Sequence, residues 1–168
     1  MTGRALLVVV ALAASTAACA SGGAVPRPFP EPATPPDTTA SRPSAEAFGH
    51  RLAATALEFR GVPYRNGGVT PAGFDCSGLV RYVLAQHGRE VPRQTRDQFT
   101  AGRRVGRNDL QAGDLVFFST VAHGASHVGI ALDDDEFVHA PSSRGVVRVE
   151  RLTTEYWRSR FIGARRVR

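Results

Sequence analysis

Residues 74–84, FDCSGLVRYVL, place one cysteine directly before an apolar run whose spacing is that of a helix. A thiol in the first turn of a helix lies beside unpaired backbone N–H groups and the positive end of the helix dipole. Both features stabilise the thiolate, which is the reactive form of cysteine. The segment therefore predicts that Cys76 is a nucleophile activated near neutral pH.

Two histidines further along the chain are candidates for the base that such a nucleophile needs. His127 opens the segment HVGI and His139 closes the segment EFVH, and the acidic stretch 133–135 lies midway between them. If these segments form a hairpin, the two histidines face each other or nearly so, with Cβ atoms about 5 Å apart. We therefore expect His127 to accept the Cys76 proton and His139 to orient the His127 ring.

The order of the expected elements indicates an α+β fold. Apolar spacing predicts helices first, over 44–60, 76–88 and 95–101. Short apolar or alternating runs then predict strands over 115–118, 128–132, 136–139, 146–149 and 161–166. We expect the N-terminal helices to pack on a central antiparallel β-sheet of about five strands.

The first residues have the pattern of an export signal. A short positive start precedes ten apolar residues, 5–14, too few to span a bilayer, and small residues then lead to Cys19. Small residues before a cysteine resemble the lipobox of bacterial lipoproteins, which predicts a signal peptide over 1–18 and lipid on Cys19. Thr16 departs from that pattern, which usually has a large aliphatic residue there, and the alternative is an ordinary signal peptide cut near Ala18 or Ala20. The residue after the cysteine is Ala20 rather than Asp. This resembles the pattern of lipoproteins that are sorted to the outer membrane, where the protein would face the periplasm.

The next segment, 19–45, is rich in Pro, Ala, Thr and Ser, so we expect a disordered tether behind the lipidated cysteine. Residues 46–168 are enough for one compact catalytic domain. The chain has two cysteines, Cys19 and Cys76, and an even count in an exported protein suggests a disulfide. Lipidation of Cys19 would exclude that pairing and leave Cys76 as a free thiol.

The net charge of +6 could suit nucleic acid, anionic lipid or an anionic wall polymer. Nucleic acid does not fit an exported chain, and the arginines are spread along the domain without the aromatic interleaving of single-strand binders. We therefore expect no nucleic-acid partner.

Six segments together resemble the NlpC-type cell-wall peptidase family, whose members are papain-like cysteine endopeptidases of bacteria. They follow the family's order across the domain and read GVPY with GG (61–64, 67–68), FDCSGLV (74–80), VPR with Gln98 (91–93), GDLVFF (113–118), SHVGI (126–130) and FVHA (137–140). The resemblance implies a papain-like domain and a lipoprotein murein endopeptidase that hydrolyses amide bonds in peptidoglycan peptide stems or crosslinks.

The same resemblance implies a role for particular residues. Cys76 matches the nucleophile, His127 the general base and His139 the third polar residue. Tyr64 matches the tyrosine that positions the thiol or the oxyanion, and the positions expected to contact substrate are Asp75, Ser77 and Ser126. The family's chemistry needs neither metal nor cofactor, and a monomer is expected. Because Asp is a preferred N-cap residue, Asp75 is also expected to cap the helix.

Other interpretations of the same residues stay open. Cys76, His123, His127 and His139 could hold zinc, although the H-E-x-x-H signature is absent. The chain could also be a wall-binding protein without activity, or a thiol acyltransferase or amidase on a related fold. Within the endopeptidase interpretation, the bond between diaminopimelate and D-Ala is favoured over the bond between D-Glu and diaminopimelate.

Overall fold

The computed structural model describes residues 45–141 and 145–167. The predicted signal peptide, the predicted lipidation site Cys19 and the predicted tether over 19–45 therefore lie outside the described residues, apart from Ala45. No helix in the described part of the chain is long and apolar enough to cross a membrane.

The helices come first along the chain, as expected. Helix α1 covers Ala45–Leu57 and α2 covers Cys76–Gln86, and a two-stranded hairpin of β1 (Val69–Thr70) and β2 (Gly73–Phe74) leads directly into α2. A single turn of helix, α3, follows at Thr95–Gln98. The third helix is thus shorter than the predicted 95–101, and the hairpin was not predicted.

The remaining elements build one antiparallel sheet of six strands with the order β3-β8-β4-β5-β6-β7. Their bounds are β3 Arg103–Val105, β4 Leu115–Phe118, β5 His127–Ala131, β6 Glu136–His139, β7 Arg148–Arg151 and β8 Phe161–Arg166. The five predicted strands are all present, with β7 two residues later than expected. The additional strand, β3, pairs with β8 at the edge of the sheet, and a 3₁₀ turn, η1 (Arg107–Asp109), follows it.

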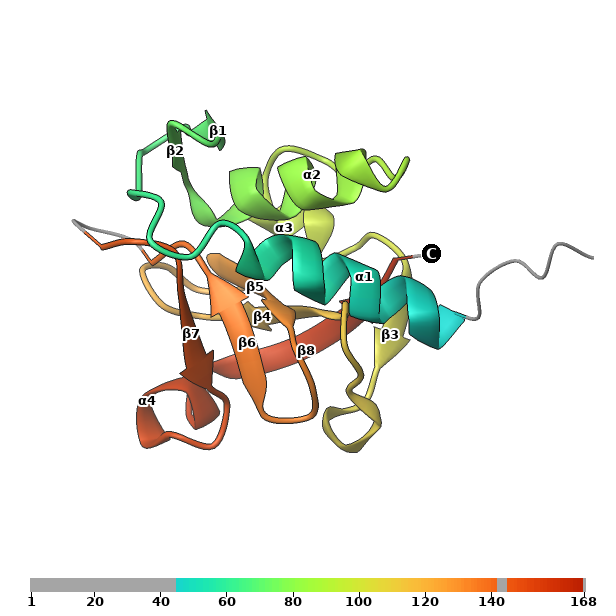
Figure 1. Cartoon of the computed structure of the whole chain (residues 1–168). Helices are drawn as coiled ribbons and strands as arrows, with labels where there is room; N and C mark the ends of the chain where they lie inside the picture. Colours follow the sequence, from blue (N-terminus) through green and yellow to red (C-terminus); the bar gives the residue numbers. More distant parts are fainter. Residues whose placement is uncertain (1–44, 142–144, 168) are drawn as a thin grey trace, which may run out of the picture. The chain divides into compact units, whose positions relative to one another are not determined.

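Each face of the sheet carries a hydrophobic core, and α1 and α2 lie along one of these faces (Figure 1). Helices α1 and α2 pack on one face, where the core contains Leu79, Val83, Phe117, Val128 and Ile130. The opposite face carries a second core with Phe118, Phe137 and Trp157, and Trp157 belongs to α4 (Glu155–Arg158). The expectation of helices on one side therefore holds for the N-terminal helices, whereas α4 covers the other side.

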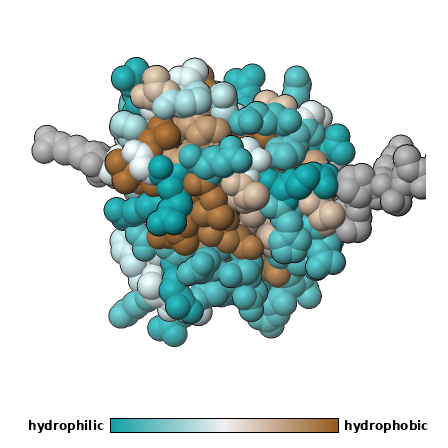
Figure 2. Space-filling view, in the orientation of Figure 1, coloured by the Kyte–Doolittle hydropathy of each residue, from teal (hydrophilic) through white to brown (hydrophobic). Residues whose placement is uncertain are grey.

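Most of the face seen in Figure 2 is hydrophilic, and its apolar surface gathers in one area near the middle. Among the described residues, the large hydrophobic side chains that remain exposed are Val69, Val121, Val146 and Tyr156.

Candidate active site

Cys76 is the first residue of α2, and short-range contacts fix its position. The Asp75 side chain caps the helix by accepting a hydrogen bond of 2.7 Å from the backbone N–H of Gly78. A Cβ atom at Gly78 would collide with the carbonyl oxygen of Gly68, so the glycine lets the start of α2 press against the loop before β1. The expected N-cap at Asp75 is confirmed.

The thiol of Cys76 is partly buried, and this changes its ionisation. Desolvation raises the pKa of the thiol above its ordinary value. The Thr95 hydroxyl, with its oxygen 3.6 Å from Sγ, and the backbone N–H groups of Val128 and Ser77 lower the pKa without cancelling that increase. The net shift of the Cys76 pKa is therefore upward, opposite to the lowering expected from the start of the helix alone.

His127 and His139 do form a pair. Nε2 of His127 lies 2.7 Å from Nδ1 of His139. The register pairs Ile130 with Val138, which places Gly129 rather than His127 beside His139. The two histidines are thus diagonal neighbours on one face of the hairpin, and a Cβ atom at Gly129 would collide with the Phe137 ring and the carbonyl oxygen of Val138.

An aromatic cluster encloses this histidine pair. The Trp157 ring stacks on His127 at 5.6 Å between centroids and meets His139 nearly at right angles at 5.0 Å. Burial lowers the pKa of His127 to about 4. Burial, followed by the charges of His127 and Arg148, lowers the pKa of His139 to about 2. Both rings are therefore neutral at neutral pH.

The nucleophile and the histidine pair approach the end of the sheet from different sides. Cys76 packs against the core beneath α1 and α2, whereas His127 and His139 contact the rings of the α4 side. They meet at the start of β5, where the N–H of Val128 acts on the thiol. Within 45–141 and 145–167, no hydrogen bond joins Cys76 to His127.

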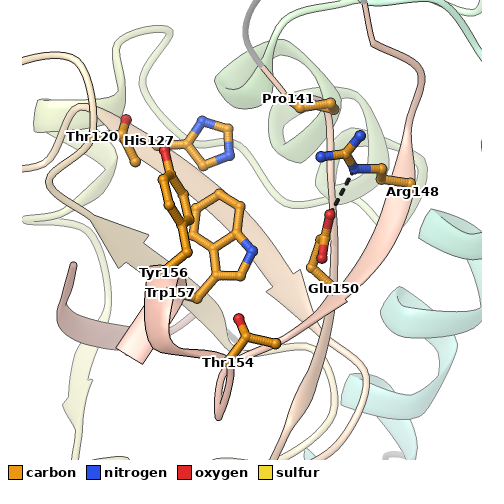
Figure 3. A pocket seen from close by; sticks show the side chains of 8 residues that line it. All are labelled: Thr120, His127, Pro141, Arg148, Glu150, Thr154, Tyr156 and Trp157. Carbon is orange, nitrogen blue, oxygen red and sulfur yellow. Dashed lines mark ion pairs between the residues drawn. The ribbon is translucent and has the colours of Figure 1, made fainter. Parts of the chain in front are cut away.

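Cys76 and His127 each line a hollow. One, of about 310 Å³, is lined by Tyr64, Asp75, Cys76, Ser77, Arg93 and Thr95, together with Asn66, Gly67 and Gln94. The other, of about 380 Å³, has His127 in its wall with Tyr156, Trp157, Arg148 and Glu150 (Figure 3). Cys76 belongs to the first hollow and His127 to the second.

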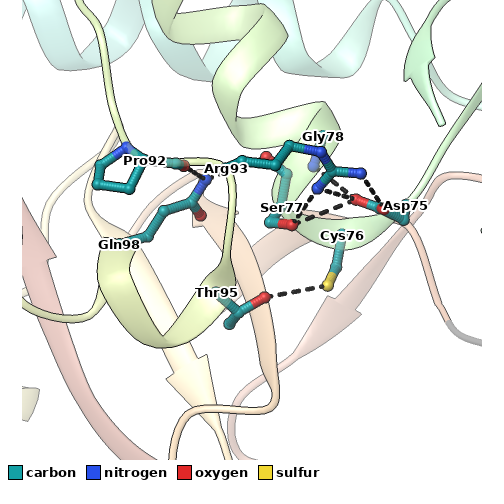
Figure 4. A network of polar contacts seen from close by, with 8 residues as sticks. All are labelled: Asp75, Cys76, Ser77, Gly78, Pro92, Arg93, Thr95 and Gln98. Atoms are coloured by element: carbon teal, nitrogen blue, oxygen red, sulfur yellow. Dashed lines mark hydrogen bonds and ion pairs between the residues drawn. The ribbon is translucent and has the colours of Figure 1, made fainter. Parts of the chain in front are cut away.

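Asp75 and Ser77 belong to a polar network beside the nucleophile (Figure 4). The guanidinium of Arg93 forms an ion pair with both carboxylate oxygens of Asp75 and donates to the Ser77 hydroxyl at 2.7 Å. The amide of Gln98 donates to the carbonyl oxygens of Ser77 and Pro92, which fastens the loop of Arg93 to α2. Sequence reasoning included Arg93 and Gln98 in a matching segment but gave neither a role.

The remaining candidates have distinct surroundings. Tyr64 lines the Cys76 hollow, and its pKa is raised by burial and by the nearby Cys76 and Asp75. The hydroxyl of Ser126 accepts a hydrogen bond of 2.8 Å from the N–H of Thr120 and lines neither hollow, so its contacts belong to the β4–β5 loop. The described residues contain no group of three or more His, Cys, Asp or Glu placed to hold a metal ion.

Trp157 is a residue of the site that sequence reasoning missed. It belongs to α4, a single turn that the apolar pattern did not reveal. It is the chain's only tryptophan, and its ring is buried against both histidines.

Comparison with known proteins gives a consistent result. Residues 61–166 match the model of the NlpC/P60 family. The chain is 36% identical to the Escherichia coli K12 protein named murein DD-endopeptidase MepS/murein LD-carboxypeptidase, over 94% of this chain and 89% of that protein. It is 41% identical to the probable endopeptidase NlpC of the same strain, over 65% of this chain and 71% of that one.

Solved structures agree with these sequence relatives. The crystal structure of an NlpC/P60 family protein from Bacillus cereus superposes with a TM-score of 0.66 at 33% identity, covering 70% of this chain and 39% of that chain. The NlpC/P60 domain of the peptidoglycan hydrolase SagA gives 0.63 at 36% identity, covering 71% of this chain and 98% of that domain. With a family match over the whole segment that carries Cys76, His127 and His139, this chain belongs to the NlpC/P60 family.

Proposed function

We propose that this chain is a peptidoglycan endopeptidase of the cysteine type. The observation that carries the proposal is the buried His127–His139 pair at the start of β5, next to the strand residue whose N–H acts on the Cys76 thiol. A nucleophile, a base and a group that orients the base are thus supplied by α2, β5 and β6. The name of the first Escherichia coli relative, a murein DD-endopeptidase and murein LD-carboxypeptidase, supports the substrate.

The neutral state of both partners makes the first step a general-base reaction. As Sγ of Cys76 attacks an amide carbonyl, the thiol proton passes to Nδ1 of His127, the nitrogen that does not face His139. Backbone N–H groups at the start of α2 and the Tyr64 hydroxyl stabilise the oxyanion. The C–N bond then breaks, His127 gives the proton to the leaving amine, and water hydrolyses the thioester.

This reaction requires one particular arrangement of hydrogens. For Nδ1 of His127 to accept a proton, Nε2 must carry the hydrogen and donate it to Nδ1 of His139. His139 then carries its own hydrogen on Nε2, which is buried and has no hydrogen-bond partner among the described residues. An unpaired buried N–H is unfavourable, and groups of this kind are often found where a protein does chemistry.

The Cys76–His127 contact must shorten during catalysis. Catalytic hydrogen bonds are often long in unliganded sites and tighten when substrate binds. A substrate amide that lies between the two hollows would bring its carbonyl to Cys76 and its nitrogen to His127, and would thereby complete the arrangement.

Within this function we favour the crosslink between diaminopimelate and D-Ala as the bond that is cleaved. Its support is the name of the Escherichia coli relative, a murein DD-endopeptidase, with which this chain aligns over most of its length. We further propose that the enzyme acts outside the cytoplasm as a monomeric lipoprotein, anchored through Cys19 at the outer membrane and facing the periplasm. The signal-like segment 1–18 supports export.

The test is digestion of purified diaminopimelate-type sacculi by the full-length protein, with the fragments identified by mass spectrometry. We expect crosslinked dimers to decrease and monomers to increase, and we expect Cys76→Ala and His127→Ala to abolish the change. His123→Ala is the matched control, because His123 is an exposed loop histidine. Release of the same fragments by Cys76→Ala would contradict the proposal, as would wild-type protein that binds sacculi without cleaving them.

A further inference from the structure

The hollow on the His127 side is large enough for a piece of substrate. Its volume of about 380 Å³ is at the lower end of the range for small-molecule sites. The rings of Tyr156 and Trp157 form one wall, and the ion pair of Arg148 with Glu150 lies across from them (Figure 3). The site therefore combines apolar surface with a charged group, as specific ligand sites do.

The position of His127 shows which part of the substrate this hollow faces. In the proposed reaction the acyl part stays on Cys76, while His127 must reach the nitrogen that leaves. A hollow with His127 in its wall and without Cys76 is thus on the leaving-amine side. The hollow that contains Cys76 is on the acyl side.

Arg148 gives the leaving-amine side a positive charge close to the reaction. It is paired in register with His139, and its charge contributes to the lowered pKa of that histidine. The Arg148 side chain is 50% exposed, so it is open to a ligand. Glu150 binds Nε of the guanidinium at 2.8 Å and so fixes its direction without enclosing it.

The acyl side also has an arginine, Arg93, but its guanidinium is already bound by other side chains. Both carboxylate oxygens of Asp75 and the hydroxyl of Ser77 already occupy the guanidinium of Arg93. Arg93 is therefore bound within the polar network beside the nucleophile, whereas Arg148 contacts Glu150 through Nε. Of the two, Arg148 is the one placed to recognise an incoming anion.

We propose that Arg148 binds a carboxylate on the carbon that carries the leaving amine, with Tyr156 and Trp157 packing against the rest of the leaving residue. The proposal rests on the proposed function and specifies its substrate. In a crosslink between D-Ala and diaminopimelate, the leaving amine is next to a free carboxylate. In the bond between D-Glu and diaminopimelate within an intact stem, the corresponding carboxyl is part of the next amide bond. Arg148 thus selects the crosslink.

The test compares two soluble crosslinked muropeptide dimers that differ only at the carboxyl next to the leaving amine, which is free in one and a carboxamide in the other. We expect wild-type full-length protein to cleave the free acid with a kcat/KM about 10- to 100-fold higher, the range for a charge-assisted hydrogen bond. In Arg148→Gln this ratio should fall close to one, and Arg148→Lys should restore part of it. Arg81→Gln, at an exposed arginine of α2, should keep the wild-type ratio.

Three results would overturn the inference. Wild-type protein that cleaves both dimers equally would show that the carboxylate is not recognised. An unchanged kcat/KM ratio in Arg148→Gln would show that Arg148 is only structural. Such a protein would cleave both dimers more slowly by the same factor, or would have a lower melting temperature than Arg81→Gln. Wild-type protein that releases no Cys76-dependent product from either dimer would instead contradict the proposed function, and the inference with it.

Discussion

Nε2 of His127 lies 2.7 Å from Nδ1 of His139, although the strands set these two residues diagonally rather than opposite each other. Gly129, the residue beside His139, carries no side chain, and a Cβ atom there would collide with the Phe137 ring and the carbonyl oxygen of Val138. The sheet register thus sets both histidines on one face, and the contact between their rings orients the base.

The first prediction concerns the orienting role of His139. We expect His139→Ala to lower kcat by about 10²-fold or more, because the His127 ring loses the partner that fixes its tautomer. His139→Asn keeps a side-chain acceptor and should retain more activity. Both are measured as release of monomers from sacculi, with melting temperature as a check on folding. Equal activity of wild type and His139→Ala would contradict the role, and His50→Ala, at an exposed helix residue, is the control.

The second prediction concerns Thr95, whose hydroxyl is the side-chain hydrogen-bond partner of the thiol. Thr95→Val keeps the shape and removes the hydroxyl, so the pKa of Cys76 should rise further. Alkylation of Cys76 by iodoacetamide at neutral pH should then slow several-fold, and its pH profile should move to higher pH. Thr95→Ser should resemble wild type.

Thr100→Val is the control for Thr95→Val, because Thr100 is exposed and its hydroxyl bonds to the carbonyl of Asp97. An alkylation profile of Thr95→Val that overlays that of Thr100→Val would show that the Thr95 hydroxyl does not act on the thiol.

The third prediction is a loss of stability in acid. The pKa values of His127 and His139 are lowered to about 4 and about 2, whereas an unfolded histidine titrates near 6.5. Below about pH 6.5 the unfolded chain therefore binds protons that the folded chain does not. The free energy of unfolding should fall by about 1.4 kcal/mol per pH unit for each such proton, between pH 6.5 and about 4, and more gradually below that.

Urea unfolding at a series of pH values measures this slope. His139→Asn removes one of the two buried histidines and should have a shallower slope than wild type over the same range. The explanation would be wrong if the two slopes were the same.

The fourth prediction concerns the ion pair between Arg93 and Asp75. The Asp75 side chain is only 12% exposed, so Arg93→Ala leaves a largely buried carboxylate without its cation. We expect a loss of roughly 1–3 kcal/mol in the free energy of unfolding, since this is the range for losing hydrogen bonds between charged groups, and the carboxylate keeps only its bonds from Gly78 and Ser77. Asp75→Ala removes the same ion pair together with the helix cap, so the two losses should not add in the double variant. Additive losses would contradict the coupling.

The sequence by itself determined the features that depend on neighbours a few residues apart. Asp75 caps a helix whose first residue is Cys76, because an Asp before an apolar run can accept the third N–H beyond it. The acidic stretch 133–135 predicts the turn between two strands. Side chains alternate between the two faces of a sheet, so a turn centred there places His127 and His139 on the same face. The short edge strand β3 and the single turn α4 carry too little periodicity to be recognised in this way.

The tertiary structure alone decided the burial of the site residues and their contacts with residues far away in the sequence. Burial reversed the expected pKa of Cys76, because desolvation outweighs the helix terminus once the domain packs around the thiol. Packing also brought Arg93 to Asp75 across 18 positions and Trp157 onto the histidine pair from α4. Local hydrogen bonds are encoded within one turn of chain, whereas desolvation and long-range pairing exist only after the elements have assembled.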